Sequence, residues 1–495
     1  MSDAVVIGGG VNGLVAAAKL AKAGRSVVLC ERSGFLGGLA AGEEIAPGHV
    51  TVGTTPETSQ IADEVVAGLS LALEREEHRP DVVFLDDEGE RLTLHGDEAR
   101  ATEEIGRHSS SDAERFGAWR AFLAKVGRVL DPLRRAAPPE VLGPGLHGWL
   151  EAGRLGASLR RLGKRDMLEL VRIAPTCAAD WLNEQFETEL LKAGLAVPGI
   201  AGTWLGPWSA GSTLNLLSHE CGARGAVKGG APALVGALES AAQAAGVELR
   251  TEAEVAGVRV DDGRVAGVTL RDGGTVDAPV VVATCDPKRT LLDLVPPRAV
   301  TQILEERVLA FRARGTTAVV HLALSGPLGL GPRARTGATL DDLERAFDGV
   351  KYGRLPESPT LEVFGDGTTV TVHAHHVPYE LEGGWNDERR EELGALVVET
   401  LARRVPAVRD GIVARVVLSP ADLAERFALT GGHLHQGEHA LDQLFVRPTP
   451  ETARYATPIP GLFLGGSGSH PGGGITGLPG WLAAGRVLDR GRRSK

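Results

Sequence analysis

Cysteine is scarce in this chain of 495 residues, and its four cysteines stand far apart, at positions 30, 177, 221 and 285. None of them forms a Cys-x-x-Cys pair, which excludes a local redox dithiol and a zinc ribbon of the usual spacing. We therefore expect reduced, mostly buried thiols in an intracellular protein.

Long apolar runs and an excess of positive charge are also missing. No run reaches the roughly 18 to 20 apolar residues that a membrane-spanning helix needs, and strand-like residues from Ala4 leave no room for a charged leader. The formal net charge of −11 offers no general attraction for the phosphates of a nucleic acid. These features predict a cytoplasmic protein without a nucleic-acid partner. Its length predicts two domains.

Glycine, by contrast, is abundant, and its first cluster lies in VVIGGGVNGL (Val5 to Leu14). A β-branched segment precedes this cluster, a helical pattern runs from Leu14 to Gly24, and a second strand pattern ends at Cys30. A glycine turn that joins strand, helix and strand within about thirty residues is typical of dinucleotide-binding proteins.

Each residue of this turn has a predicted role. Gly8 permits a tight turn, Gly10 lets the backbone approach a pyrophosphate, and Gly13 lets the helix pack closely on the strand. Val11 and Asn12 open the helix, where free N–H groups and the positive end of the helix dipole attract phosphate. All five are predicted cofactor-binding residues.

The next strand ends in Glu31, placed to accept hydrogen bonds from the adenosine ribose and to repel the extra phosphate of NADP. Arg32 and the doublet Gly37-Gly38 follow. This continuation resembles the Arg-x-x-x-x-Gly-Gly signature of flavoproteins in the amine oxidase and phytoene desaturase superfamily, where it lies against the FAD pyrophosphate. The resemblance implies FAD as the cofactor. Many members have a basic residue where this chain has Leu39, so it implies only a backbone contact there.

The C-terminal end repeats the pattern of a strand, a glycine loop and a helix. The strand pattern ends at Leu464, the loop is GGSGSHPGGGITG, and Pro479 fits the first turn of a helix. A helix N-terminus stabilises the negative charge that reduction leaves on a flavin ring. A glycine-rich surface loop is the alternative. The predicted cofactor contacts in this loop are Gly466, Ser467, Gly474, Ile475 and Thr476.

The middle of the chain supplies a third block. A helical pattern follows Lys228-Gly229-Gly230, and alternating strands with Asp-Gly turns at positions 262 and 272 then form a β-meander. In the superfamily this block completes the FAD domain, with a backbone contact to adenine at the position of Val255.

These blocks predict an α/β fold. A Rossmann-type FAD-binding domain, with a parallel sheet and a β-meander, would comprise residues 1–75, 215–300 and 455–495. An inserted α+β substrate domain would comprise residues 76–214 and 301–454.

The segments Ala428 to Gly480 and Gly42 to Gly48 resemble phytoene-desaturase-like flavoproteins. They are most similar to the branch named pyridine nucleotide-disulfide oxidoreductase domain-containing protein 2. However, the chain lacks a second nucleotide-binding motif and a dithiol, so it does not fit an NADPH–disulfide reductase. Electrons should leave the flavin to oxygen or a quinone.

The leading hypothesis is therefore an FAD-dependent oxidoreductase that desaturates a hydrophobic, isoprenoid- or carotenoid-like substrate by hydride transfer to flavin N5. Three alternatives stay open. They are a flavin-dependent amine oxidase, a non-redox polyene isomerase that uses reduced FAD, and a flavin-binding regulatory protein without turnover.

No definite catalytic side chain emerges, because hydride transfer depends on position more than on a strong acid or base. His435 and Glu438 are weak candidates, since the resemblance places their loop near the isoalloxazine; the alternative is that they hold the loop. His-Gln-Gly-Glu-His (His435 to His439) matches an inverted zincin pattern, but Gly437 interrupts the helix that such a site needs. No metal site is predicted.

The segment Arg154 to Arg172 places Leu155, Leu159 and Leu162 on one face among basic residues. Such a helix can lie on an anionic membrane, which would make the protein peripheral at a membrane surface. An ordinary solvated helix beside the substrate pocket is the alternative.

Overall fold

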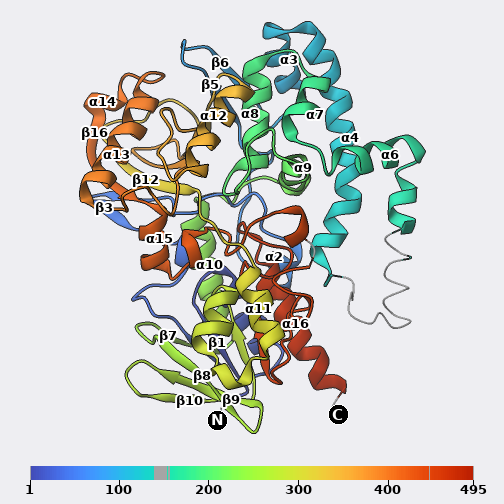
Figure 1. Ribbon diagram of the computed structural model, residues 1–495, viewed down its shortest axis with the longest axis vertical. Coiled ribbons are helices and arrows are strands. Elements are labelled where there is room, and N and C mark those ends of the chain that lie inside the picture. Colours follow the sequence, from blue (N-terminus) through green and yellow to red (C-terminus); the bar gives the residue numbers. More distant parts are fainter. Residues whose placement is uncertain (1, 139–152, 154–155, 445, 494–495) are drawn as a thin grey trace.

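The computed structural model describes residues 2–138, 153, 156–444 and 446–493, and the two ends of the chain lie together in the lower half of Figure 1. The same part of the molecule contains a five-stranded sheet. In spatial order its strands are β17 (Leu462–Leu464), β11 (Val281–Ala283), β1 (Ala4–Ile7), β2 (Val27–Cys30) and β7 (Glu248–Arg250). All neighbouring strands pair in parallel. The predicted parallel sheet is therefore confirmed.

Both faces of this sheet are covered, which explains why its strands are apolar throughout. Successive side chains of a strand point to opposite faces, so Val6 packs with the helices and Val5 with the β-meander. The covering helices are α1 (Val11–Lys22), α10 (Gly230–Ala244) and α16 (Leu478–Arg493).

The β-meander is antiparallel and consists of β8 (Val255–Asp261), β9 (Arg264–Leu270) and β10 (Thr275–Asp277). Asp262 and Gly263 join β8 to β9 with φ values of 47° and 72°. Positive φ at both central residues is the geometry of a tight type I′ turn, which an Asp-Gly pair favours. The meander predicted from this pair is therefore confirmed.

A larger mixed sheet lies in the upper left of Figure 1. Its order is β16 (Ile412–Leu418), β12 (Thr317–Leu324), β15 (Thr369–His375), β14 (Leu361–Phe364), β13 (Arg333–Thr336), β5 (Val82–Leu85) and β6 (Arg91–Leu94). Strand β5 pairs in parallel with β13, so two distant parts of the chain share this sheet. Strands β3 (Glu44–Ala46) and β4 (His49–Val50) pair with each other and form a separate two-stranded antiparallel sheet.

Helices between β6 and α10 pack around aromatic rings, with the ring centroid of Trp119 5.9 Å from that of Trp181. They are α3 (Glu98–His108), α4 (Ser110–Arg135), α6 (Lys164–Ile173), α7 (Ala178–Gln185), α8 (Glu189–Ile200) and α9 (Ser212–Gly222). The other α-helices are α2 (Asp63–Leu69), α11 (Gln302–Ala310), α12 (Leu340–Lys351), α13 (Asp387–Ala402), α14 (Val408–Gly411) and α15 (Pro420–Phe427). Short helical turns are η1 (Gly38–Ala40), η2 (Arg289–Leu294), η3 (Pro297–Ala299), η4 (Thr430–Gly432) and η5 (Leu441–Gln443).

The domain boundaries stay a prediction. Two helices lie at or beside them. Helix α9 runs through the proposed boundary at residue 215. Helix α11 follows the proposed boundary at residue 300, yet its Leu304 and Val308 pack in the hydrophobic cluster beneath the β-meander.

The basic segment from Arg154 to Arg172 is only partly described, since Arg154 and Leu155 lie outside the described residues. Leu159 and Leu162 pack against the cluster of helices α3 to α9. Their face is thus directed toward the protein, as in the alternative of a flanking helix, and peripheral membrane contact stays a prediction. Among the described residues, no helix combines the length and apolarity required to span a membrane.

Candidate active site

A cavity opens at the carboxyl ends of β1, β2 and β11. This edge of a parallel sheet is where α/β proteins bind dinucleotides. The structure brings twelve of the fifteen predicted cofactor-binding residues to its lining. They are Gly8, Gly10, Val11, Asn12, Glu31, Arg32, Gly37, Gly38, Val255, Ser467, Gly474 and Ile475.

The glycines of the first turn differ in what their missing side chains would meet. A Cβ on Gly13 would lie 1.9 Å from the carbonyl oxygen of Gly8, so only glycine permits this close contact between helix and strand. A Cβ on Gly10, by contrast, would meet no atom within 4 Å and would project toward the cavity that Gly10 lines. The chain therefore leaves room at Gly10 for a bound group.

The N-terminus of helix α1 faces the part of the cavity beside Gly10. Gly10 is its N-cap, no side chain caps it, and its first turn contains no acidic residue. The N–H groups of a helix's first turn have no partner within the helix, and together with the dipole they favour a negatively charged ligand. These features fit the pyrophosphate of FAD.

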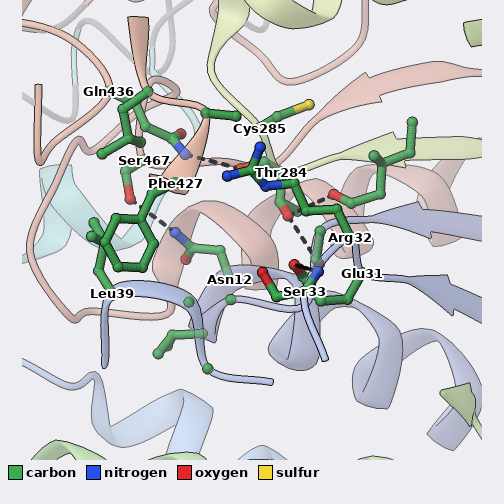
Figure 2. Close-up of a pocket in the computed structure, with 18 of the residues that line it drawn as sticks. Asn12, Glu31, Arg32, Ser33, Leu39, Thr284, Cys285, Phe427, Gln436 and Ser467 are labelled. Carbon is green, nitrogen blue, oxygen red and sulfur yellow. Dashed lines mark hydrogen bonds between the residues drawn. The ribbon is translucent and has the colours of Figure 1, made fainter. Parts of the chain in front are cut away.

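Glu31 directly follows β2 at the rim of the cavity (Figure 2). Its carboxylate accepts hydrogen bonds from the backbone N–H of Gly9 at 2.6 Å and of Ser33 at 2.8 Å. Arg32 points elsewhere: its guanidinium donates to the carbonyl oxygens of Glu425, at 3.0 Å, and of Arg426. Arg32 thus joins this rim to the end of α15.

The second glycine turn lies directly on the first. The N–H of Gly37 donates to the carbonyl oxygen of Gly9 at 2.8 Å. A Cβ on Gly38 would lie 3.3 Å from the Cα of Gly10, and both glycines of the doublet have positive φ. The doublet therefore brings its backbone to the same part of the cavity as Gly10.

Three of the predicted residues lie behind the lining. Gly13 packs on Gly8, and a Cβ on Gly466 would lie 2.4 Å from the carbonyl oxygen of Thr284. The hydroxyl of Thr476 accepts the N–H of Leu478 at the start of α16, and Thr476 is buried. Their predicted contact with the cofactor would have to be indirect.

A second cavity adjoins the first, and four residues line both: Thr55, Leu434, Gly474 and Ile475. We call this second cavity the chamber. The sequence predicts a hydrophobic substrate, yet much of the chamber's lining is polar. Five histidines line it: His219, His373, His375, His435 and His439.

Three charged side chains of the chamber, Glu57, Arg333 and Glu362, are paired with one another. Arg333 bonds to Glu362, with Nε 2.9 Å from Oε1, and also to Glu57. Arg335 lies behind them and donates to the same oxygen of Glu362 at 2.6 Å. Burial acts to raise the pKa of Glu362, but the two guanidinium groups outweigh it and hold that pKa well below its ordinary value.

Burial keeps three of the chamber's histidines neutral near pH 7. Burial lowers the pKa of His373 and of His435 to about 4 and lowers that of His439 well below its ordinary value. The rings of His435 and His439 are stacked, with centroids 5.2 Å apart. Neutral imidazoles offer both a donor and an acceptor to a bound molecule.

Comparison with known proteins decides the family. A family model described as flavin containing amine oxidoreductase matches residues 12–488. The chain belongs to the flavin-containing amine oxidoreductases.

Two relatives cover almost the whole of this flavin-containing amine oxidoreductase. It is 30% identical to pyridine nucleotide-disulfide oxidoreductase domain-containing protein 2 of Mus musculus, over 97% of this chain and 92% of that protein. It is 27% identical to hydroxyneurosporene desaturase of Rubrivivax gelatinosus, also over 97% and 92%. The solved structure of a putrescine oxidase with bound putrescine has a TM-score of 0.60 at 17% identity and covers 99% of each chain, which supports the fold. The predicted family, FAD cofactor and oxidoreductase class are confirmed.

The structure separates the two weak catalytic candidates of this flavin-containing amine oxidoreductase. His435 lines the chamber, and its Nδ1 has no hydrogen-bond partner among the described atoms. Glu438 lines neither cavity and is 2% exposed. Its carboxylate accepts from Nε and Nη2 of Arg314 at 2.7 and 2.9 Å. This geometry favours a structural role for Glu438.

The surrounding loop has no arrangement suited to a metal. Gln436 and Gly437 have φ values of 55° and 150°, so the His-Gln-Gly-Glu-His segment is not helical. Within the described part of the chain, no group of three or more His, Cys, Asp or Glu side chains is placed to hold a metal ion.

Several lining residues were not predicted, and Thr284 is the most informative. Its hydroxyl donates to the carbonyl oxygen of Ile7 at 2.8 Å, and its own carbonyl accepts from Nε2 of Gln436 at 3.1 Å (Figure 2). Thr284 directly follows a strand that ends beside β1, so the rule for parallel sheets could have found it. No local pattern indicates Gln436 or Phe427.

Proposed function

We propose that this flavoprotein oxidises an organic substrate bound in the chamber and that the reacting part of the substrate is apolar. FAD, when bound, supplies a hydride acceptor at N5 of its ring. The observation that carries the proposal is the wall common to the two cavities, formed by Thr55, Leu434, Gly474 and Ile475. These residues mark the boundary where the two cavities meet, and the reacting carbon of a molecule in the chamber would contact the bound cofactor there.

The residues of the wall suit this task. Leu434 and Ile475 are buried, at 8% and 6% exposure, and present apolar surface to both cavities. Their side chains exclude water and orient a hydrocarbon segment, and orientation contributes most to hydride transfer. Removal of two hydrogens from carbon also releases a proton. His435 stays the candidate to accept it, because its Nδ1 is unpartnered.

The names of the relatives support desaturation. One of them is a hydroxyneurosporene desaturase, which favours formation of a carbon–carbon double bond in an isoprenoid-like substrate. Amine oxidation is the main alternative, supported by the family description and by the fold of putrescine oxidase. Among the described residues, however, Phe364 is the one Phe, Tyr or Trp of the chamber, so no pair of such rings flanks an amine there. Oxygen or a quinone is the proposed electron acceptor.

Anaerobic reduction of the bound flavin tests the proposal. The FAD-loaded protein is mixed with carotenoid precursors, monoterpenes, primary amines and acyl compounds, and the visible flavin absorbance is recorded. Bleaching by an isoprenoid or acyl compound, followed by reoxidation with oxygen or a quinone, is the expected result. Bleaching by amines alone would favour the amine oxidase, and product of unchanged mass formed only after chemical reduction would favour the isomerase. A flavin that stays oxidised with every compound would contradict the proposal and favour a regulatory protein.

A further inference from the structure

Arg134, at the end of α4, lines the chamber without a carboxylate partner. Its Nη1 donates to the carbonyl oxygen of Ser218 at 3.2 Å, and its Nη2 donates to Oε1 of Gln60 at 3.0 Å. No described Asp or Glu lies within ion-pair distance of it. Because a guanidinium has five N–H donors, these two contacts leave donors for a ligand.

Arg134 stands apart from the paired charges of the chamber. Glu57 and Glu362 face the guanidinium of Arg333, and Arg335 lies behind them. Asp131, on the same helix and outside the chamber lining, acts on the charge of Arg134 without forming an ion pair with it. Removing an ionised group from water is costly unless an opposite charge accompanies it, and a bound carboxylate would supply that charge at close range.

The chamber also contains polar atoms with no hydrogen-bond partner in the described protein. They are Oγ1 of Thr55, Nε2 of His219 and Nδ1 of His435. Buried polar atoms are almost always hydrogen-bonded, so several unsatisfied atoms in one cavity call for an explanation. A pure hydrocarbon could not satisfy them, whereas a molecule with oxygen atoms could.

We propose that the substrate of the chamber is an apolar carboxylic acid and that Arg134 binds its carboxylate. The planar guanidinium matches a carboxylate in geometry and can donate to both of its oxygens. The second charge of a phosphate dianion would find no further unpaired cation among the described residues of the lining. This inference rests on the proposed function, because it names the substrate class of the same chamber.

The position of Arg134 suits such an anchor. Gln60, its hydrogen-bond partner, has Oε1 3.7 Å from the place where a Cβ on Gly474 would lie. Gly474 belongs to the wall shared with the cofactor cavity. The guanidinium is therefore one side chain away from that wall, and a carboxylate bound there keeps the attached carbon chain close to the cofactor.

Ligand titration of the FAD-loaded protein tests the proposal with three probes of equal chain length: octanoate, octanol and octyl phosphate. Binding is followed through the change in the visible flavin spectrum and through the thermal midpoint. The variants are Arg134→Gln, Arg134→Lys and, as a matched control, Arg128→Gln. Arg128 lies on the same helix and is exposed outside the chamber.

We expect octanoate to bind the wild-type protein at least tenfold more tightly than octanol or octyl phosphate. Arg134→Gln should raise the Kd of octanoate at least tenfold and leave that of octanol unchanged. Arg134→Lys, which keeps the charge but loses the planar fork, should cause a smaller loss. Arg128→Gln should change neither Kd.

Equal Kd values for octanoate and octanol in the wild-type protein would overturn the proposal, and this comparison requires no variant to fold. Tighter binding of octyl phosphate would overturn the carboxylate assignment. An Arg134→Gln protein that folds and binds octanoate like Arg128→Gln would overturn the role of Arg134.

The titration needs bound FAD but no turnover, so it separates this inference from the proposed function. Selective octanoate binding without flavin reduction by any compound would contradict the oxidation and retain the carboxylate site. Flavin reduction by neutral hydrocarbons at equal rates in the wild type and in Arg134→Gln would support the oxidation and overturn the carboxylate site.

Discussion

Asn12 and Ser467 lie 455 positions apart in the sequence, and Nδ2 of Asn12 donates a hydrogen bond to Oγ of Ser467 at 3.1 Å beside the cofactor cavity (Figure 2). Asn12 stands in the first turn of α1, and Ser467 in the loop that leads to α16. This bond joins the first glycine motif to the last, so the two ends of the chain form one side of one binding site.

Breaking this bond should weaken FAD binding. We expect Asn12→Ala and Ser467→Ala each to raise the Kd of FAD about fivefold, the equivalent of about 1 kcal/mol. Because both variants remove the same bond, the double variant should lose less than the sum of the two. Fluorescence titration of apoprotein with FAD measures all three. Strictly additive losses would show that the two side chains act independently.

Gly10 should be essential for cofactor binding but not for folding. Its φ of −68° is open to any residue, and a side chain there would extend into the cavity. We therefore expect Gly10→Leu to lose FAD affinity more than tenfold while the circular dichroism spectrum is unchanged. Gly236→Leu is the matched control, because Gly236 is exposed in α10 and also has no neighbour within 4 Å. This control should bind FAD normally and gain up to about 1 kcal/mol of helix stability.

The sequence predicts the cofactor cavity far better than the chamber, for a physical reason. The role of Gly8 or Gly37 depends on its own backbone conformation and on neighbours within a local motif, so residue type and spacing carry the signal. From the sequence alone, Arg134 cannot be distinguished from the other basic residues of its amphipathic helix. Its role appears only when tertiary packing brings α4 beside Gln60 and α9.

The polarity of the chamber shows the same limit. Glu57 comes from a loop near the N-terminus and Glu362 from β14, and Arg333 on β13 joins them. No pattern in the sequence links Glu57 to Arg333, which are 276 positions apart and pair only in the folded chain. The expectation of a hydrophobic substrate came from the resemblance to desaturases and did not include this cluster.

A substitution of Thr284, which was not predicted from the sequence, tests whether its hydroxyl stabilises the glycine turn. Its hydroxyl holds the carbonyl oxygen of Ile7, directly before Gly8. Thr284→Val keeps the shape and removes the hydroxyl. We expect it to lower the free energy of unfolding by about 1 kcal/mol and to raise the Kd of FAD severalfold. Thr290→Val is the comparison, since Thr290 is also buried but bonds to the carbonyl oxygen of Asp286; it should lose stability and leave FAD affinity unchanged.

Acid should destabilise the fold through its buried histidines. Burial lowers the pKa of four of them to about 4: His321, His373, His435 and His470. Since the unfolded chain binds protons near pH 6.5 and the folded chain does not, their stabilising contribution is fully present above pH 6.5. Each histidine loses up to about 1.4 kcal/mol of it per pH unit as the pH falls toward 4.

Thermal midpoints between pH 7.5 and 5 measure this effect. The fall in midpoint should be smaller in His435→Asn than in the wild-type protein, because one of the four contributions is gone. His78→Asn replaces an exposed histidine and should keep the full fall. A midpoint that does not change between pH 7.5 and 5 would contradict the burial of these rings as neutral imidazoles.

Substitutions of Glu438 and His435 should have different effects: the first on the stability of the fold, the second on the rate of flavin reduction. Because Glu438 bonds to Arg314 outside both cavities, Glu438→Gln should lower the free energy of unfolding by about 2 kcal/mol. It should leave the rate of anaerobic flavin reduction within twofold, measured with whichever compound bleaches the flavin. His435→Asn should slow that reduction at least tenfold, because His435 faces the chamber. If Glu438→Gln slowed reduction and His435→Asn did not, the carboxylate would have to reach the substrate through a rearrangement of its loop.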